Sequence, residues 1–143
     1  MPVKYQQETA QITWEAAQAL IEAVLKEGAA QKIAFSIAVM DAGGHLRAFG
    51  RADEAAFLTA EIACDKAWTA CSFGQPTHIW NSLVQESHMA PLASHPRLMA
   101  VGGGYPIFYQ GRLIGGLGVS GGTYEQDQEA AVKALSFTGF DKL

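Results

Sequence analysis

The sequence predicts an α+β domain in which a mostly antiparallel sheet of about five strands is flanked by helices. Apolar residues recur at helical spacing in some segments and alternate with small residues in others. The predicted strands follow one another in hairpins rather than in β-α-β units, so neighbouring strands are expected to run antiparallel. The 143 residues suit a single domain, residues 1–143, which is long enough to bury a core without disulfides or metals.

The first half of the chain supplies a helix and a hairpin. A row of apolar residues at helical spacing predicts a helix over residues 13–26, with Thr13 as its N-cap and Gly28 as its C-cap. β-branched and aromatic residues that alternate with small ones predict a strand over residues 33–40. A glycine-rich turn and a second strand over residues 45–50 complete the hairpin.

The second half of the chain supplies the remaining helices and strands. A predicted helix over residues 57–73 is broken by a glycine and a proline, and Thr77 is then placed as the cap of a short helix over residues 78–85. Residues 86–97 show no period and are interpreted as a loop. The last elements are strands predicted at residues 98–101, 106–109 and 112–119 and a final helix over residues 124–137.

The composition favours self-association over other partners. Charged residues make up 17% of the chain, below the ~25% typical of soluble domains, which favours a homo-oligomer over a compact monomer. The net charge is -4 and the basic residues are scattered, so neither nucleic acid nor a membrane is an expected partner. No segment has the length of an apolar span and the N-terminus lacks a signal-peptide core, so a cytoplasmic location is expected.

Two glycine clusters are candidate ligand-binding loops. Residues 116–121 match G-x-G-x-x-G, but only one helix follows and no acidic residue stands ~20 positions further on, so a dinucleotide fold is rejected. The backbone N–H groups of residues 119–122 would either receive an anion or merely precede a helix that Thr123 caps. Residues 102–104 form either a backbone wall against a ligand or a strained corner.

Glycines also thin the side-chain cover of the last predicted strand. They occupy positions 115, 116 and 118. A strand with so few side chains allows another backbone, a helix or a ligand to approach closely.

Lys66 and Arg51 are the candidate cationic residues. Lys66 lies among small and apolar residues of a predicted helix, so its side chain either extends to solvent or meets a buried partner. Held near the glycine loops, it would bind an anionic group or act as an acid or base with a lowered pKa. Arg51 forms either a surface ion pair with Asp53 or Glu54 or a contact to an anion.

The four histidines lack the spacing of a zinc site, so no metal site is predicted. Because haem can be held by a single axial side chain, His78 at a helix start is a candidate haem ligand. The alternative for His78 is a hydrogen-bonded surface residue. Cys64 and Cys71 lie two turns apart on one predicted helix, too far for a disulfide, and are interpreted as small buried residues.

A set of short motifs spread over nearly the whole chain resembles one known family. The motifs are Val39–Gly44 with Arg51, Lys66–Ala70, Pro76 with Thr77, Gly103–Ile107, Gly111, and Ile114–Gly122 followed by Gln126 and Asp127. In this order they resemble the GlcG/HbpS family, which includes the C-terminal domain of PduO-type proteins. The resemblance implies a profilin-like antiparallel sheet flanked by helices and assembly into symmetric oligomers. Some members of that family bind haem or related tetrapyrroles, and the PduO relatives are linked to corrinoid metabolism.

The residues and the resemblance together predict a protein that binds a small anionic molecule, such as haem or another tetrapyrrole held through its acid groups. The alternatives are a small catabolic enzyme of the lyase, hydrolase or isomerase type acting on an organic acid, and an accessory subunit that stabilises a larger enzyme. In the enzyme alternative, Lys66 or Asp127 is the general acid or base, and no catalytic residue is transferred from the family. The residues expected to line or support the site are Arg51, Lys66, Thr77, His78, Gly104, Pro106, Ser120, Gly121 and Asp127.

Overall fold

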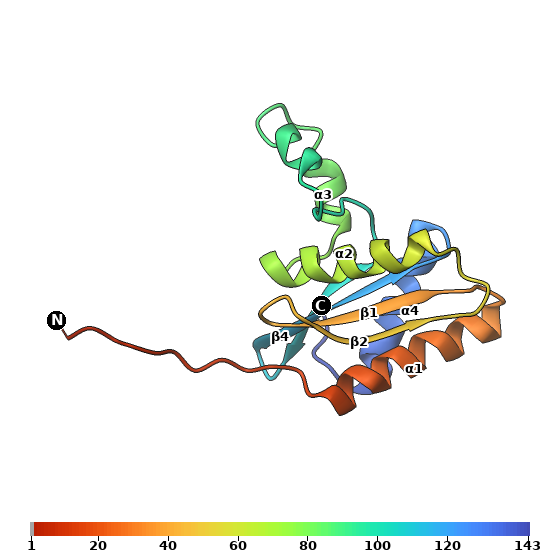
Figure 1. The fold of residues 1–143 in the computed structure, drawn as a ribbon, viewed down its shortest axis with the longest axis horizontal. Coiled ribbons are helices and arrows are strands. Elements are labelled where there is room, and N and C mark those ends of the chain that lie inside the picture. The colour runs from red at the N-terminus through yellow and green to blue at the C-terminus, as the bar shows by residue number, and fades with distance from the viewer. Residues whose placement is uncertain (1) are drawn as a thin grey trace.

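A four-stranded antiparallel sheet forms the centre of the protein (Figure 1). The computed structural model describes residues 2–143. Across the sheet the strands lie in the order β2 (Leu46–Arg51), β1 (Ser36–Asp41), β4 (Arg112–Ser120) and β3 (Gly104–Tyr109). Every neighbouring pair is antiparallel, and pairing of β1 with β4 joins two hairpins into one sheet. The predicted α+β class and the antiparallel pairing are therefore confirmed.

Helices cover both faces of this sheet (Figure 1). α1 (Trp14–Gln31) and α4 (Tyr124–Thr138) pack on one face and against each other. α2 (Leu58–Phe73) packs on the opposite face, where it contacts β1, β3 and β4. None of the helices within residues 2–143 combines the length and the hydropathy needed to cross a bilayer.

The two faces of the sheet differ in side-chain size. The face toward α1 and α4 carries large apolar residues such as Ile37 and Leu117, which form the main core. The face toward α2 carries Ala38, Gly116 and Gly118. Without side chains there, the α2 backbone approaches so closely that a Cβ at Gly118 would lie 2.7 Å from the backbone nitrogen of Ala67. The sequence left open whether another backbone, a helix or a ligand would approach these glycines. The structure places helix α2 against them.

The prediction of about five strands was wrong by one, because residues 98–101 do not form a strand. Side chains of the neighbouring helices form hydrogen bonds with the backbone of this segment instead. The Thr69 hydroxyl accepts the N–H of Met99 at 3.0 Å, and the Asn81 amide donates to the carbonyl of Ala100 at 3.1 Å. This segment therefore links two helices rather than extending the sheet.

The start of α1 matches its prediction, but its end does not. The Thr13 hydroxyl accepts the N–H of Ala16 at 3.1 Å, so Thr13 is the N-cap. α1 continues through Gly28, and Lys32 ends it in the left-handed conformation with φ of 59°. Gly28 is needed for packing, because a Cβ there would lie 2.5 Å from the carbonyl oxygen of Ile33.

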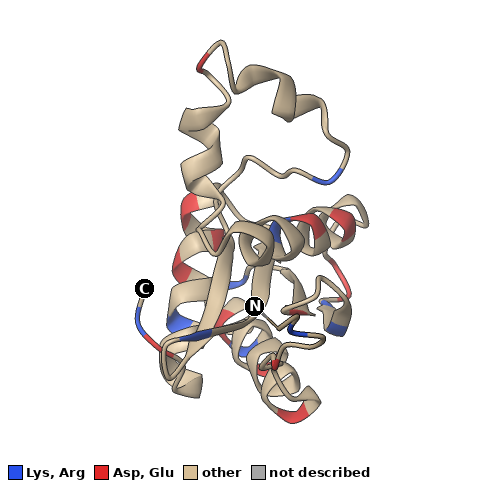
Figure 2. Cartoon of the chain, turned by 90° about the vertical axis from the view of Figure 1, so that its left-hand side faces the viewer, with Lys and Arg blue, Asp and Glu red and all other residues tan. Residues whose placement is uncertain are grey.

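α3 (His78–Leu83) and a 3₁₀ helix, η1 (Ala90–Ser94), stand away from the sheet in a segment that we call the arm, residues 74–103 (Figures 1 and 2). η1 lies within the predicted loop 86–97. Between residues 74 and 96 Glu86 is the only residue among Asp, Glu, Lys and Arg. The arm thus exposes a surface almost without charge.

The base of the arm is fixed to α2 by Arg97. Its guanidinium lies 4.4 Å from the ring centre of Trp68, and its Nε donates to Asp65 at 3.2 Å. The carbonyl oxygen of Arg97 accepts the Thr69 hydroxyl at 2.9 Å. These contacts join the C-terminal part of the arm to a single face of α2.

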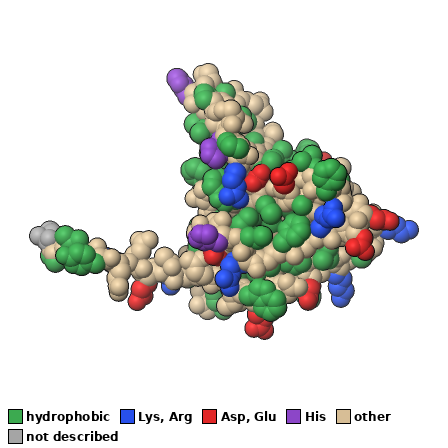
Figure 3. Space-filling model, viewed as in Figure 1, with side chains coloured by type: hydrophobic (Ala, Val, Ile, Leu, Met, Phe, Trp, Pro, Cys, Tyr) green, Lys and Arg blue, Asp and Glu red, His purple; other side chains and the backbone are tan. Residues whose placement is uncertain are grey.

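Apolar side chains also gather on the face shown in Figure 3. Those exposed on β2 and around the start of α2 are Leu46, Phe49, Phe57 and Leu58.

Candidate functional site

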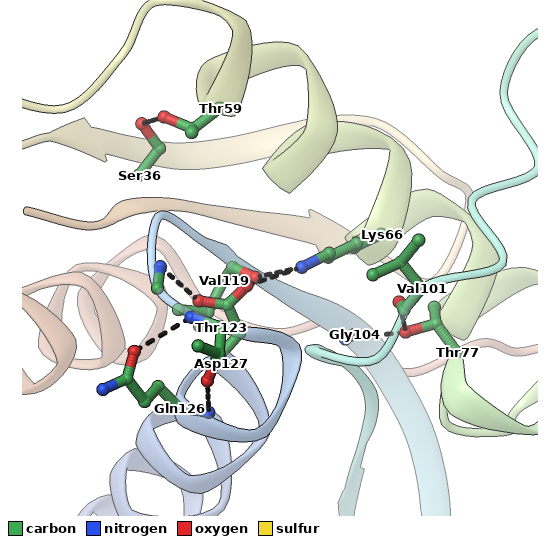
Figure 4. Close-up of polar contacts among 11 residues, drawn as sticks. Ser36, Thr59, Lys66, Thr77, Val101, Gly104, Val119, Thr123, Gln126 and Asp127 are labelled. Carbon is green, nitrogen blue, oxygen red and sulfur yellow. Dashed lines mark hydrogen bonds and ion pairs between the residues drawn. The ribbon is translucent and has the colours of Figure 1, made fainter.

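A buried ion pair joins α2 to α4 beside the glycine clusters (Figure 4). Lys66 Nζ donates to Asp127 Oδ2 at 2.9 Å and to the carbonyl oxygen of Val119 at 2.8 Å. The side chains of Lys66 and Asp127 are 1% and 4% exposed. Of the two alternatives for Lys66, the structure shows the buried partner. Gly103 makes room for the pair, since a Cβ there would lie 2.7 Å from Nζ.

Burial shifts the pKa of both members of the pair toward the neutral form. Desolvation lowers the pKa of Lys66, and the attraction of Asp127 opposes this shift. Desolvation raises the pKa of Asp127, and Lys66 and the N–H of Gly122 oppose it. Such shifts occur in catalytic sites and in structural ion pairs alike. The pair links α2 to the first turn of α4 past the end of β4, and because it is closed to solvent it gives a ligand no direct access.

The first turn of α4 is closed by side chains of the chain itself. Asp127 Oδ1 accepts the N–H of Gly122 at 2.9 Å. The side chains of Thr123 and Gln126 bond each other's backbone N–H at 3.1 and 2.9 Å, which makes a complete capping box. The N–H of Val119 donates to the carbonyl of Gly103 at 3.0 Å. Capping is therefore what the structure shows at residues 119–123, and the N–H groups of Val119 and Gly122 are not free for an anion.

Thr77 occupies the predicted N-cap position of α3, but its side chain makes no capping bond to the helix. Its hydroxyl instead donates to the carbonyl of Val101 at 2.6 Å and accepts the N–H of Gly104 at 2.9 Å (Figure 4). Thr77 is fully buried. It therefore ties both ends of the 102–104 glycine loop to the start of α3.

Replacing Thr77 by Val should lower the free energy of unfolding by about 2–3 kcal/mol, because it leaves the buried N–H of Gly104 without a partner and removes the hydrogen bond to the carbonyl of Val101. Thr77→Ser keeps the hydroxyl and should lose only about 1 kcal/mol, for the missing methyl group. Urea unfolding followed by tryptophan fluorescence measures both values. Equal losses in the two variants would contradict the role given to the hydroxyl.

Four further predicted site residues lie around the ion pair as backbone or packing elements. A Cβ at Gly104 would lie 2.6 Å from the carbonyl oxygen of Lys66. Pro106 is buried in β3, an edge strand, which is where a sheet tolerates a residue without an N–H. Ser120 is buried at the end of β4. Gly121 has φ of +144° and packs on the backbone of Phe35. None of the four presents a side chain to solvent.

Arg51 does not join this group. It pairs with Ser36 of β1, and Ser36 pairs in turn with Ser120 of β4, so a whole strand lies between Arg51 and the ion pair. Its side chain is exposed and donates to the carbonyl of Ala55 at 3.4 Å. Within residues 2–143 it makes no ion pair, so the predicted surface pair with Asp53 or Glu54 is wrong.

His78 is exposed, and its ring centre lies 6.2 Å from that of Tyr105. Its ring nitrogens make no hydrogen bond to another residue within residues 2–143. Two other histidines are bonded through Nδ1. His45 Nδ1 lies 3.2 Å from Asp41 Oδ1, and His95 Nδ1 accepts the N–H of Arg97 at 3.2 Å.

Two parts of this region were not predicted from the sequence. Tyr105 was not among the predicted site residues, although the alternation of side chains along a strand indicates where it lies. Gly104 and Pro106 face α2, so Tyr105 faces the opposite side of the sheet, toward α1 and α4. The bond from Lys66 to the carbonyl of Val119 could not be predicted from side chains, because its acceptor is a backbone atom. Only the fold brings it there.

Comparison with known proteins identifies the scaffold. A family model described as "Haem degrading protein HbpS-like" matches residues 12–136. An uncharacterized 15.0 kDa protein of Citrobacter freundii is 36% identical over 132 residues, 90% of this chain and 93% of its own length. The corrinoid adenosyltransferase PduO of Citrobacter freundii is 37% identical over 108 residues, 70% of this chain but 31% of PduO. This chain therefore corresponds to about a third of PduO.

Solved structures agree with these matches. The Klebsiella pneumoniae protein ORFY superposes with a TM-score of 0.89 at 37% identity, covering 96% of this chain and 97% of ORFY. A complex of PduOC with haem superposes with a TM-score of 0.86 at 27% identity, covering 93% of this chain and 99% of PduOC. With the family model matching most of its length, the chain belongs to the HbpS-like family.

Proposed function

We propose that the chain binds a haem-type tetrapyrrole and that His78 supplies the axial ligand to the metal. The observation that carries the proposal is an exposed imidazole, free of hydrogen bonds within residues 2–143, beside the aromatic ring of Tyr105. Coordination needs a ring nitrogen with a free lone pair. His95 does not meet this need: its Nδ1 accepts a hydrogen bond, so the neutral ring carries its proton on Nε2. The haem complex of PduOC, a relative with the same fold, supports the ligand class.

The proposal gives the buried residues a supporting role. Lys66 and Asp127 link α2 to the first turn of α4 but lie too deep to meet the acid groups of a ligand. Thr77 fixes the chain next to His78 through its bonds to Gly104 and Val101. The acid groups of the ligand would therefore meet exposed cations rather than Lys66.

The catalytic alternative places acid–base chemistry on Lys66 and Asp127. Their shifted pKa values would suit such chemistry. A substrate would first have to displace the 102–104 loop, which Thr77 and the N–H of Val119 hold in place. We therefore favour binding over catalysis.

We also propose that the chain forms a homo-oligomer through the arm. Support comes from the scarcity of charge on the arm and from apolar residues exposed on it, Leu92 at 39% and Val101 at 41%. Depletion of charged residues is a mark of interface cores. Sedimentation of a species at the 15.3 kDa of one chain would contradict self-association.

A haemin titration followed in the Soret region tests the proposed function. The unmodified protein should show one saturable shift, and His78→Ala should weaken the affinity at least about tenfold by removing the metal ligand. His88→Ala changes an exposed histidine of the arm and should bind haemin like the unmodified protein.

His45→Ala is the sharper control, because the Nδ1 of His45 contacts Asp41 and leaves Nε2 available. Its side chain is 81% exposed at the β1–β2 turn. A loss caused by His45→Ala instead of His78→Ala would overturn the assignment of the ligand. A shift that never saturates would overturn haem binding itself.

A further inference from the structure

An apolar groove lies between α4 and the C-terminal segment, away from the ion pair. Val132 and Leu135 of α4 form one wall, Phe140 the other, and Tyr105 of β3 lies at its base. Its volume is about 320 Å³, at the lower end of the ~300–1,000 Å³ of small-molecule sites. Val132 is 45% exposed, so the apolar wall is open to solvent.

Hydrogen bonds hold the second wall in place. Gly139 ends α4 in the left-handed conformation with φ of +99°, and the N–H of Phe140 then donates back to Leu135 at 3.1 Å. The N–H of Asp141 donates to the carbonyl of Phe108 in β3 at 2.9 Å. The groove is therefore preformed, and a ligand need not pay the entropy of ordering it.

The charges around the groove differ between its two ends. Both oxygens of Asp141 are used by the β3–β4 turn, since they accept the N–H groups of Gln110 and Gly111 at 3.0 and 2.8 Å. Lys142 also lines the groove and makes no ion pair within residues 2–143. This end therefore presents an unpaired ammonium next to the Asp141 carboxylate, which stays charged, and next to Leu143.

The other end continues into a second hollow that shares Tyr105 and Val132. That hollow is lined by Glu125, Gln128, Glu129 and Lys133. Lys133 is paired with Glu129 and Glu27, so this end repels carboxylates. Tyr105, common to both hollows, is the residue whose ring lies beside His78. His78 lines neither hollow, but its ring centre lies 6.2 Å from that of the shared Tyr105, and the unpaired ammonium of Lys142 lies at one end of the groove.

We propose that this groove is the binding site for the macrocycle of a tetrapyrrole, with Lys142 binding a ligand carboxylate. The inference rests on the proposed function, because it names where the same ligand lies. The apolar walls match the hydrophobic faces of the macrocycle. The orientation follows from the unpaired lysine: the acid groups lie at Lys142, whereas Lys133 at the other end is already paired with Glu129 and Glu27.

Metal-free protoporphyrin IX tests the groove independently of the axial ligand, because it has no metal for His78 to coordinate. Its fluorescence should report one saturable site in the unmodified protein. Val132→Glu, which introduces a better helix former but puts a charge on the apolar wall, should weaken binding at least about tenfold. Lys142→Glu should weaken it about tenfold at low salt and less at high salt.

Leu46→Glu is the matched control. Leu46 is 53% exposed on β2, at the opposite edge of the sheet from β3. It should leave the porphyrin affinity unchanged. Thermal unfolding and sedimentation of each variant show that it is folded and report its oligomeric mass.

The outcomes separate the two proposals. If haemin binds through His78 but the Val132 and Lys142 variants keep their affinity for protoporphyrin and haemin, the groove inference fails and the proposed function stands. If Val132→Glu changes the oligomeric mass while porphyrin affinity is unchanged, the groove is a contact between copies of the chain and the inference fails. If neither haemin nor protoporphyrin binds the unmodified protein, both proposals fail.

Discussion

Lys66→Met should lower the free energy of unfolding by about 3–5 kcal/mol at neutral pH, because it leaves the carboxylate of Asp127 buried without its cation. Methionine has nearly the same length and helix propensity as lysine, so α2 itself should persist. The backbone N–H groups of Gly122 and Gly121 would then be the hydrogen-bond donors that remain for Asp127. Urea unfolding of the two proteins measures the difference.

The loss of stability in Lys66→Met should depend on pH, which a simple packing defect would not. Burial already raises the pKa of Asp127 above its ordinary 3.8, and Lys66→Met removes the cation that opposes that shift. A group with a raised pKa binds its proton more tightly in the folded state, so its penalty is present above that pKa and fades as the pH falls toward 3.8. The loss in Lys66→Met should therefore shrink from pH 7 toward acid pH.

A double variant separates charge from packing. Lys66→Met combined with Asp127→Asn removes the buried charge but keeps an oxygen for the N–H of Gly122. It should be more stable at neutral pH than Lys66→Met alone and should lose the pH dependence of that variant. Lys133→Met, which changes an exposed lysine paired with Glu27 and Glu129, should have little effect. A double variant no more stable than Lys66→Met would show that packing, not charge, explains the loss.

The ion pair could not be predicted from the sequence, because its partners lie 61 residues apart and on different helices. The local signals were present: Lys66 stands among small residues, and Asp127 stands in the first turn of a helix after a glycine loop. Which helix ends meet depends on the strand order β2-β1-β4-β3. That order is set by the long-range pairing of β1 with β4, which leaves no trace in local periodicity.

The elements that were predictable are those that local chemistry determines. The β1–β2 and β3–β4 hairpins follow from alternation and turn residues, and Thr13 and Thr123 cap their helices. Residues 98–101 show the limit of this reasoning. A short apolar run is compatible with a strand or with irregular buried chain, and here the side chains of distant residues on α2 and α3 satisfy its backbone. Such partners belong to the tertiary structure alone.

Gly118→Ala should destabilise the protein by at least ~3 kcal/mol, because the added methyl group would overlap the carbonyl oxygen of Ala63 and lie 2.7 Å from the nitrogen of Ala67. Both atoms belong to the backbone of α2, so no side chain can rotate away to make room. α2 would have to lift from β4. Thermal unfolding monitored by circular dichroism should show a large fall in Tm, or no folded protein.

Gly111→Asn is the matched control for Gly118→Ala. Gly111 lies in the β3–β4 turn with φ of +79°, and a Cβ there has no neighbour within 4 Å. Asparagine tolerates the left-handed region, so the change should cost little. Similar losses at the two positions would contradict a steric cause. Because α2 also carries Lys66, any folded Gly118→Ala protein should have a displaced ion pair. Adding Lys66→Met to it should then cost less than the same change costs the unmodified chain.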